Sequence, residues 1–344
     1  MIQQHGGNIG QLKDILDFSA NINPLGCPDS VKRAITASID GIEKYPDPYC
    51  RRLRSKLSMH ESISADNIVC GNGADDLIFR IVHALRPKKA LVCAPTFSEY
   101  SRALTEAGCE VCEHMLTEDK GFELEEDILP KLDSSLDMCF LCTPNNPTGR
   151  LIAPEILENI AAKCRDSGII LVCDECFIDF VSGGGRYSLQ CFMNGSCIIL
   201  KAFTKLFAMP DIRLGYAICG SSALAERIQQ SGQFWSVSNL AQRAGTAALD
   251  EAEYVLKTRE YIAAERRFLS EELNRLGVKV FDGAANFLLF KSRIGLAEEL
   301  LAEGILIRDC SNFSGLSEGF YRIAVRTHEE NIRLASALRR CLNG

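Results

Sequence analysis

The sequence predicts an α/β protein with a mostly parallel sheet in a large domain and a smaller α+β domain after it. Short apolar runs recur between residues 90 and 219, and helical stretches separate most of them. These runs are almost continuously apolar, which is typical of parallel strands covered on both faces. From about Val237 the pattern changes to a long helical stretch, several short strands and a last helix. A chain of 344 residues is long enough for two packed domains.

In the large domain, apolar residues at helical spacing predict the first helices. Val31 and Ile35 belong to a helix expected over 30–39, and Leu77 and Ile81 to one over 76–85. Further helices are expected over 98–107, 125–132 and 154–165, and Pro154 suits the first turn of the last one. The expected strands cover residues 90–93, 110–115, 138–142, 169–173, 197–200 and 214–219.

The expected domain boundaries are an N-terminal arm over 1–26, a large domain over 27–236 and a small domain over 237–344. The arm is expected to pack with the small domain. In the small domain, a helical stretch runs through Arg266 to Leu276, strands are expected over 278–281, 286–290, 304–307 and 320–325, and a helix over 328–342 closes the chain.

The charge balance excludes several classes of partner. With 38 Lys+Arg against 45 Asp+Glu the formal net charge is -7, and there is no basic tail to neutralise a nucleic-acid backbone. No apolar run approaches the roughly 18 residues of a membrane span, and the first residues do not resemble a signal peptide. We therefore expect a cytoplasmic protein that binds neither nucleic acid nor membrane.

Sixteen cysteines raise the question of a metal or disulfide framework. Three pairs have the Cys-x-x-Cys spacing: Cys109/Cys112, Cys139/Cys142 and Cys173/Cys176. A spacing of three residues in a strand, as expected over 138–142, sends the two side chains to opposite faces. The pairs are therefore interpreted as reduced apolar residues, and no metal site is predicted.

The most informative segment is 197–216, in which an apolar strand delivers Thr204 and Lys205 to a turn and Arg213 follows. A lysine amine in an enclosed site forms a Schiff base with an aldehyde cofactor. A hydroxyl and a guanidinium beside it suit a phosphate. The segment indicates an anchor for pyridoxal phosphate (PLP), although a Thr-Lys pair alone is common.

A second phosphate-suited segment is 70–76, where Gly71 and Gly73 lie between a strand and a helix. Backbone N–H groups at a helix start, exposed by glycines, bind phosphate with the help of the helix dipole. A lone Gly-x-Gly is usually only a turn. Together with the Lys205 segment it favours a bound phosphate.

Three further residues follow strand ends, where ligands of parallel sheets bind. Phe97 could stack on a pyridine ring, and a buried loop aromatic is the alternative. Asn146 could donate to the ring's phenolic oxygen, or belong to a proline-stiffened turn. Asp174 could pair with the pyridine nitrogen and keep it protonated, or be an ordinary loop carboxylate.

In this order along the chain, the motifs resemble the fold type I PLP-dependent enzymes, in the branch that holds histidinol-phosphate aminotransferase. The resemblance implies that Lys205 is the Schiff-base lysine and Asp174 the partner of the pyridine nitrogen, the two catalytic residues. It gives the remaining cofactor contacts to Gly73, Ala74, Asp75, Phe97, Asn146, Thr204 and Arg213. It also implies a homodimer with shared active sites, in which Tyr45 reaches the neighbour's cofactor phosphate. The branch usually has a tyrosine three residues after the aspartate, where this chain has Phe177.

The N-terminal segments 5–9 and 17–26 resemble the threonine-phosphate decarboxylase family of cobalamin synthesis, in which a phenylalanine at the position of Phe177 is normal. The likeness extends to 305–308 and 321–322. It implies a phosphorylated amino acid as substrate, held by His5, Asn23, Asn146, Arg308 and Arg322, with Arg326 as a further candidate.

Three alternatives stay open. A decarboxylase breaks the bond between the substrate's Cα and its carboxylate, and a histidinol-phosphate aminotransferase breaks the bond between Cα and hydrogen. The residues alone do not reveal which of the two bonds breaks. Phosphoserine is an allowed variant substrate, because one methyl group changes binding by only about 1–3 kcal/mol. A PLP-sensing regulatory module would need an attached DNA-binding domain, for which no room is expected before residue 17.

Overall fold

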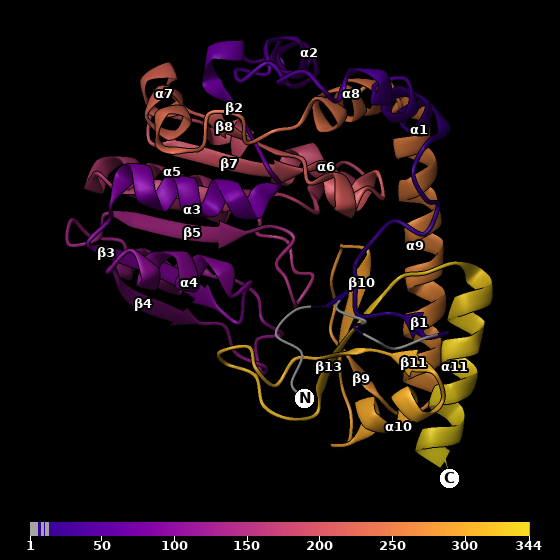
Figure 1. Cartoon of the computed structure of the whole chain (residues 1–344). Helices are drawn as coiled ribbons and strands as arrows, with labels where there is room; N and C mark the ends of the chain where they lie inside the picture. Colours follow the sequence, from indigo (N-terminus) through magenta and orange to yellow (C-terminus); the bar gives the residue numbers. More distant parts are fainter. Residues whose placement is uncertain (1–5, 8–9, 11–13, 344) are drawn as a thin grey trace.

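The large domain is organised by a seven-stranded sheet, as predicted (Figure 1). The computed structural model describes residues 6–7, 10 and 14–343. In sheet order the strands are β2 (Ile68–Gly71), β8 (Gly215–Cys219), β7 (Cys197–Ala202), β6 (Ile170–Asp174), β5 (Met138–Cys142), β3 (Lys89–Ala94) and β4 (Glu110–Met115). β8 pairs antiparallel with both of its neighbours, and all other pairs are parallel. The predicted fold class is confirmed.

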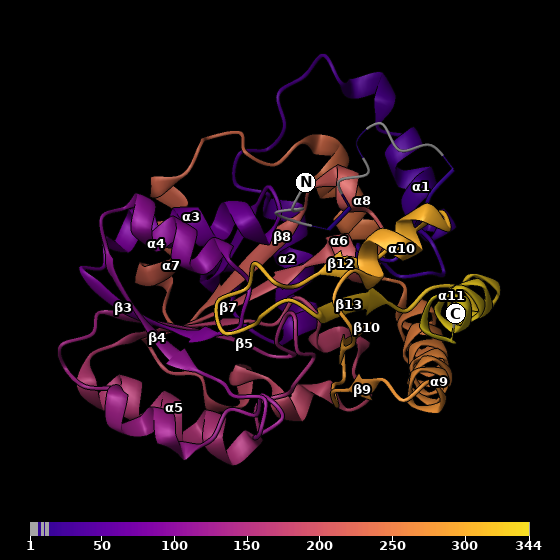
Figure 2. The same cartoon turned by 90° about the horizontal axis from the view of Figure 1, so that it is seen from below.

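Helices cover both faces of this sheet (Figure 2). α3 (Ala74–Leu85), α4 (Glu99–Glu106) and α7 (Ser222–Ser231) lie on one face, and α5 (Pro154–Ser167) lies on the other. Alternate residues of β5 enter separate cores: Phe140 and Cys142 pack on the α3 side, and Cys139 and Leu141 on the other. Cys139 and Cys142 therefore point to opposite faces, as the strand pattern predicted.

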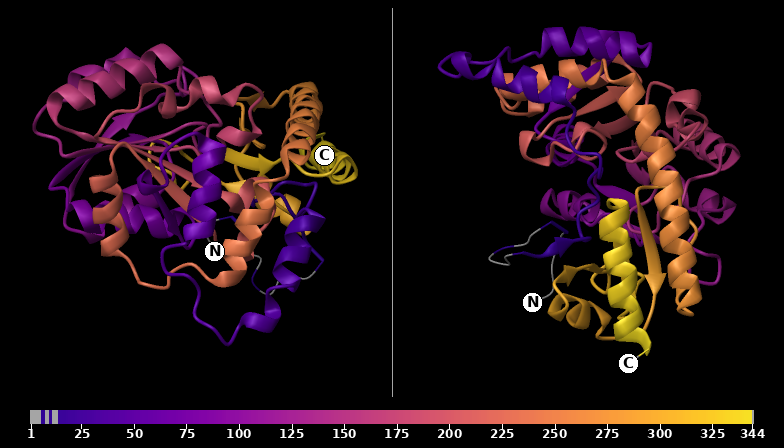
Figure 3. Two further views of the ribbon diagram at one scale, coloured as in Figure 1. Left: turned by 90° about the horizontal axis from the view of Figure 1, so that it is seen from above. Right: turned by 90° about the vertical axis from the view of Figure 1, so that its right-hand side faces the viewer.

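The small domain contains a four-stranded antiparallel sheet and long helices. The sheet order is β12 (Arg308–Asp309), β13 (Phe320–Ala324), β10 (Phe287–Lys291) and β9 (Lys279–Val280). α9 (Ala252–Arg275) and α11 (His328–Asn343) pack side by side along it (Figure 3, right). β1 (Leu16–Asp17) pairs in parallel with β11 (Ile305–Leu306), so the N-terminal segment is tied to the small domain.

Several helices were not singled out from the sequence. They are α2 (Arg51–Glu61), α7, α8 (Asn239–Ala248) and α10 (Leu296–Ala302). The first helix, expected over 30–39, is α1 (Asp29–Thr36). Residues 126–131 form a 3₁₀ helix where an ordinary helix was expected, and Pro130 inside it lacks the N–H that an α-helical hydrogen bond needs. α6 (Phe203–Leu206) is a single turn that follows β7 directly. No described helix is long and apolar enough to cross a membrane.

Candidate active site

A cavity of about 360 Å³ lies where β5, β6 and β7 end and the small domain approaches them. Most of the residues predicted from the sequence line it: Ala74, Asp75, Phe97, Asn146, Asp174, Thr204, Lys205, Arg213, Arg308 and Arg322. They come from segments that are far apart in the chain. The position is the usual one for ligands of a parallel sheet.

Lys205 lies on α6, immediately after β7, and its side chain faces this cavity. Burial lowers the pKa of its amine to about 8, and the positive charge of Arg322 lowers it further, with Arg213 acting in the same direction. About a tenth of the amine is therefore unprotonated at pH 7, far more than for an ordinary lysine. That is the form that attacks an aldehyde.

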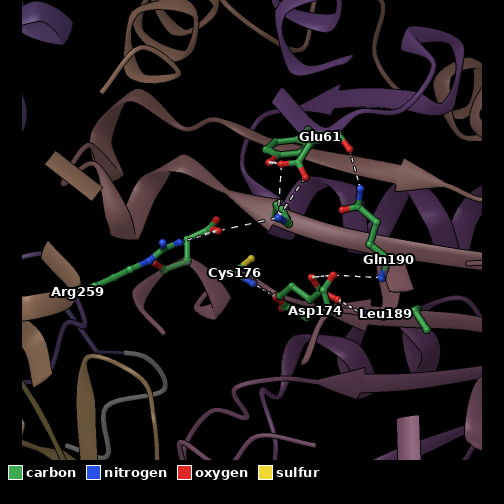
Figure 4. A network of polar contacts seen from close by, with 11 residues as sticks. Glu61, Asp174, Cys176, Leu189, Gln190 and Arg259 are labelled. Atoms are coloured by element: carbon green, nitrogen blue, oxygen red, sulfur yellow. Dashed lines mark hydrogen bonds and ion pairs between the residues drawn. The ribbon is translucent and has the colours of Figure 1, made fainter. Parts of the chain in front are cut away.

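Asp174 is the last residue of β6, and its buried carboxylate also lines the cavity. Oδ2 accepts a hydrogen bond of 2.6 Å from the Tyr100 hydroxyl. Oδ1 accepts one of 2.9 Å from the backbone N–H of Cys176, which Figure 4 shows. Both oxygens are thus oriented by protein donors. An oriented carboxylate at this place can accept a further proton donor from a ligand.

The start of α3 forms a cradle that fits a phosphate. Gly73 has φ +90°, and a Cβ built on it would lie 2.6 Å from Nη2 of Arg213, so only glycine lets the guanidinium approach so closely. Ala74 and Asp75 are the first residues of α3, and the N-terminus of a helix is the end that attracts anions. Thr204 adds a hydroxyl to the same cavity. The donor set suits the phosphate of PLP.

Two arginines of the small-domain sheet face each other across the β12–β13 pair. Arg308 and Arg322 are direct cross-strand partners, and their exposed fractions are 1% and 5%. Arg308 donates to Asn312 Oδ1 at 2.7 Å, and Arg322 to Asn146 Oδ1 and to the carbonyl of Ser19. Burial lowers the pKa of Arg322 to about 10, and repulsion from Arg308 adds to the shift. Two buried cations side by side are stabilised by bound anions.

Two aromatic side chains shape the wall of the cavity. Phe97 lies edge-on to Tyr100, with ring centroids 5.6 Å apart, and Phe177 packs edge-on against Phe287 at 5.1 Å. Both Phe97 and Phe177 line the cavity. Phe177 has no hydroxyl, so this side chain offers no hydrogen bond to a group in the cavity.

Two of the predicted residues, Asn23 and Tyr45, do not line the cavity. Asn23 is engaged by the protein: Nδ2 donates to the Leu206 carbonyl and to Thr258 Oγ1, and Oδ1 accepts from Leu25 N–H. This arrangement argues against Asn23 as a substrate ligand, because its hydrogen-bonding groups are already used.

Tyr45 is 80% exposed and stacks on Trp235, with ring centroids 4.5 Å apart, and within one chain it does not line the cavity. That placement leaves its predicted role across a dimer interface as a prediction. His5 lies outside the described residues.

Two residues that sequence reasoning passed over belong to the site. Asn21 lines the cavity, and its buried Oδ1 has no hydrogen-bond partner among the described residues. It stands two positions before Asn23 in the same Asn-Ile-Asn motif, and only the course of the backbone distinguishes the two. Tyr100 lies on α4 and looked like an ordinary core position of an amphipathic helix.

A second polar network lies beside the cavity, around Lys201 of β7 (Figure 4). The Lys201 amine is 3.4 Å from both carboxylate oxygens of Glu61, and the Tyr216 hydroxyl donates to the same carboxylate. Glu175 is held by Ser188 Oγ and by Leu189 N–H, each at 2.7 Å. Burial raises the pKa of Glu175 to about 7, although Lys201 opposes the shift. These residues do not line the cavity.

No cluster of three or more His, Cys, Asp or Glu side chains suited to a metal ion is found within the described ranges. The cysteines there are all free thiols. Cys142 and Cys176 line the cavity, and burial raises the pKa of both thiols, so they are protonated at neutral pH.

The fold and the site define a PLP-dependent enzyme of the aminotransferase type. The family model described as "Aminotransferase class I and II" matches residues 13–338, so the chain belongs to this family, and its cofactor is pyridoxal phosphate. The residues present fit that cofactor, with an amine of lowered pKa, an oriented carboxylate and a phosphate cradle around one cavity.

Individual relatives divide between two activities. The threonine-phosphate decarboxylase of Salmonella typhimurium is 39% identical over 99% of this chain and 97% of its own. Among solved structures, the histidinol-phosphate aminotransferase of Clostridium acetobutylicum has a TM-score of 0.89 at 33% identity, covering 96% of this chain and 99% of its own. The L-threonine-O-3-phosphate decarboxylase of Porphyromonas gingivalis has a TM-score of 0.81 at 27% identity, covering 95% and 99%.

Proposed function

We propose that the protein decarboxylates L-threonine O-3-phosphate to (R)-1-amino-2-propanol O-2-phosphate and CO2, a step of cobalamin biosynthesis. The observation that carries the proposal is the buried pair of Arg308 and Arg322 facing the same cavity as Lys205. A phosphorylated amino acid brings a phosphate and a carboxylate, which matches two cations in a chain whose net charge is -7. The 39% identity with a threonine-phosphate decarboxylase supports this substrate.

In this proposal the cofactor is held by residues of the large domain. Lys205 would carry it covalently, Asp174 would face its pyridine nitrogen, and the cradle at Gly73 with Thr204 and Arg213 would hold its phosphate. When bound, PLP supplies an electron sink for the pair released at the substrate's Cα. Asn146, whose Oδ1 is occupied by Arg322, has its Nδ2 left to donate to the ring oxygen.

The protein's own residues then decide which bond at Cα breaks. Arg308 and Arg322 fix the two anionic ends of the substrate, and fixing both ends sets the rotation about the bond between the amine nitrogen and Cα. We propose that this rotation aligns the carboxylate for departure as CO2.

Lys205 supplies the proton that replaces the lost carboxylate. With a pKa of about 8, its ammonium form is populated near neutral pH and gives up its proton readily. The proton passes from Nζ to Cα, so the amine is left neutral and the carbon regains four bonds. Residues of both domains line the cavity, which limits competing protonation by water.

We also propose a homodimer in which Tyr45 contributes to the partner's cofactor phosphate. Tyr45 lies in an exposed aromatic cluster with Tyr49, Phe234 and Trp235, each at least 39% exposed. An exposed aromatic cluster of this kind is typical of a protein interface. Light scattering at several concentrations, with a Tyr45→Ala variant compared for PLP affinity, tests it.

A second candidate is a histidinol-phosphate aminotransferase, favoured by the TM-score of 0.89 with such an enzyme. The test is to incubate the PLP-loaded protein with L-threonine O-3-phosphate and measure CO2, and in parallel to supply histidinol phosphate with 2-oxoglutarate and measure glutamate. The proposal predicts CO2 without any added oxo acid. Glutamate formation without CO2 would establish the aminotransferase instead. O-Phosphoserine in the first assay measures how much the substrate's methyl group contributes.

A further inference from the structure

The hydroxyl of Tyr100 is the closest side-chain donor recorded on Asp174. It lies 2.6 Å from Oδ2, and Tyr100 is fully buried, so water does not compete for this bond. The ring is fixed on both sides: it stacks on Phe140 with an interplanar angle of 12°, and Phe97 lies edge-on to it. The packing holds the phenol oxygen beside Asp174, with the Cys142 thiol as its other polar side-chain neighbour.

The surroundings keep this hydroxyl protonated. Burial raises the pKa of Tyr100 well above its usual value, and the negative charge of Asp174 raises it further. The titratable groups that face Asp174 are Tyr100 of α4, Cys142 at the end of β5, Cys173 of β6 and Cys176. Burial raises the pKa of all three thiols, so within the described chain Tyr100 is the strong neutral donor of this group.

We propose that Tyr100 is a positioning residue that holds Asp174 as an oriented carboxylate and thereby keeps the pyridine nitrogen of the bound cofactor protonated; this inference rests on the proposed role of Asp174. A hydrogen bond donated to a carboxylate stabilises the ionised form. A proton shared between the carboxylate and the ring nitrogen then stays on the nitrogen. The ring accepts electrons better in that state, so Tyr100 sets the strength of the electron sink without touching the substrate.

Loss of the Tyr100 hydroxyl and a stronger donor in its place are expected to move the shared proton in opposite directions. Without the Tyr100 hydroxyl, the Asp174 carboxylate binds a proton more strongly, and the shared proton moves from the ring nitrogen toward Asp174. A stronger donor at position 100 moves the proton the other way. Two substitutions at one site therefore shift the cofactor in opposite directions, which a purely structural role does not produce.

The test uses PLP labelled with ¹⁵N in the ring, bound to wild-type protein and to Tyr100→Phe. The expected result is a ¹⁵N chemical shift displaced toward neutral pyridine, with kcat reduced by about tenfold or more and KM changed by less than twofold, as for loss of one hydrogen bond to a charged group. The matched control is Tyr216→Phe, which removes a buried phenol-to-carboxylate bond outside the cavity. The control is expected to keep the wild-type ¹⁵N shift.

A fold-neutral second variant carries 2,3-difluorotyrosine at position 100, whose hydroxyl is a stronger donor. It is expected to displace the ¹⁵N signal toward pyridinium. If Tyr100→Phe keeps both the wild-type ¹⁵N shift and kcat within twofold, or if both substitutions move the signal the same way, the proposal is overturned. The ¹⁵N measurement needs only bound cofactor, so it remains decisive even if the protein yields no CO2 from threonine phosphate.

Discussion

Lys201 and Lys205 are close neighbours in the sequence, one inside β7 and one on the turn that follows it, yet their surroundings shift their pKa values in opposite directions. Burial lowers the pKa of Lys205 to about 8, and Arg322 strengthens the effect. Burial alone would lower the pKa of Lys201 too, but the carboxylates of Asp179, Glu61 and Glu175 outweigh it and raise the value. Burial lowers the pKa of an amine only where neighbouring carboxylates do not outweigh it.

We therefore expect Lys205 to act in the reaction and Lys201 to stabilise the fold. Lys205 shares its cavity with two buried arginines, so its amine is available as a nucleophile. Lys201 links α2, β7 and the segment of Asp179, and Arg259 of α9 approaches that same aspartate (Figure 4). The second lysine is expected to stabilise the packing of α9 on the large domain.

The largest effect is expected at Lys205. Lys205→Ala removes both the cofactor's covalent anchor and the proton donor, so we expect activity to fall by more than about a thousandfold. The visible absorbance band of the PLP-loaded protein is expected to change to that of free or loosely bound cofactor. Lys201→Met is the matched control, and it is expected to retain the band. Equal loss of the band in both variants would contradict the division of roles.

Lys201→Met is expected to act on stability. It leaves the carboxylate of Glu61 buried without its cation, which typically costs about 3–5 kcal/mol. Denaturant titration would measure this as a lower midpoint. Adding Glu61→Gln to the variant is expected to recover part of the loss, because it removes the uncompensated charge. A midpoint unchanged by Lys201→Met would show that the network contributes little.

Replacing Arg322 by a neutral residue is expected to weaken substrate binding and to change the pKa of Lys205. Arg322→Gln removes a cation from the substrate's anion and should raise KM by about a hundredfold. It also removes the repulsion that lowers the pKa of Lys205, so that pKa is expected to move up toward its ordinary value. Competitive labelling of the apoprotein across pH, read at Lys205 by mass spectrometry, measures the shift.

Arg326→Gln is the control for this pair of effects. Arg326 is bound to Glu330 and does not line the cavity, so both KM and the labelling midpoint should stay near wild type. Equal effects from the two arginines would place the substrate elsewhere than proposed.

The smallest effect is expected from the pH dependence of Glu175. Its pKa in the folded protein is about 7 against an ordinary value of 4.5, so the folded state holds a proton that the unfolded chain has released. Its contribution to stability is complete below about pH 4.5 and is lost as the pH rises through about 7. Glu175→Gln is expected to raise stability at pH 8 by roughly 1–3 kcal/mol and to flatten this part of the profile. An unchanged profile would mean that Glu175 is ionised throughout.

Much of the fold followed from local patterns. The apolar runs located six strands of the large sheet to within a few residues, and the strand expected just before the Gly71 turn is β2. Phe97, Asn146 and Asp174 were foreseeable because the carboxyl ends of parallel strands meet at one edge, whereas Ala74 and Asp75 were expected from the family resemblance.

The features that the sequence did not predict depend on contacts between residues far apart in the chain. Glu61 reaches Lys201 across 140 positions, and Tyr100 reaches Asp174 across 74, so no periodicity reveals either pair. The choice between Asn21 and Asn23 depends on the turn of the backbone between them. Such contacts arise only when the sheet has formed and its helices have packed.

The most direct test of the central claim is borohydride reduction of the PLP-loaded protein, followed by peptide mapping. The account predicts a single pyridoxyl group on Lys205, none on Lys201, and no labelling at Lys201 when Lys205 is replaced by alanine. A pyridoxyl group on Lys201, or a protein that takes up no cofactor covalently, would contradict it.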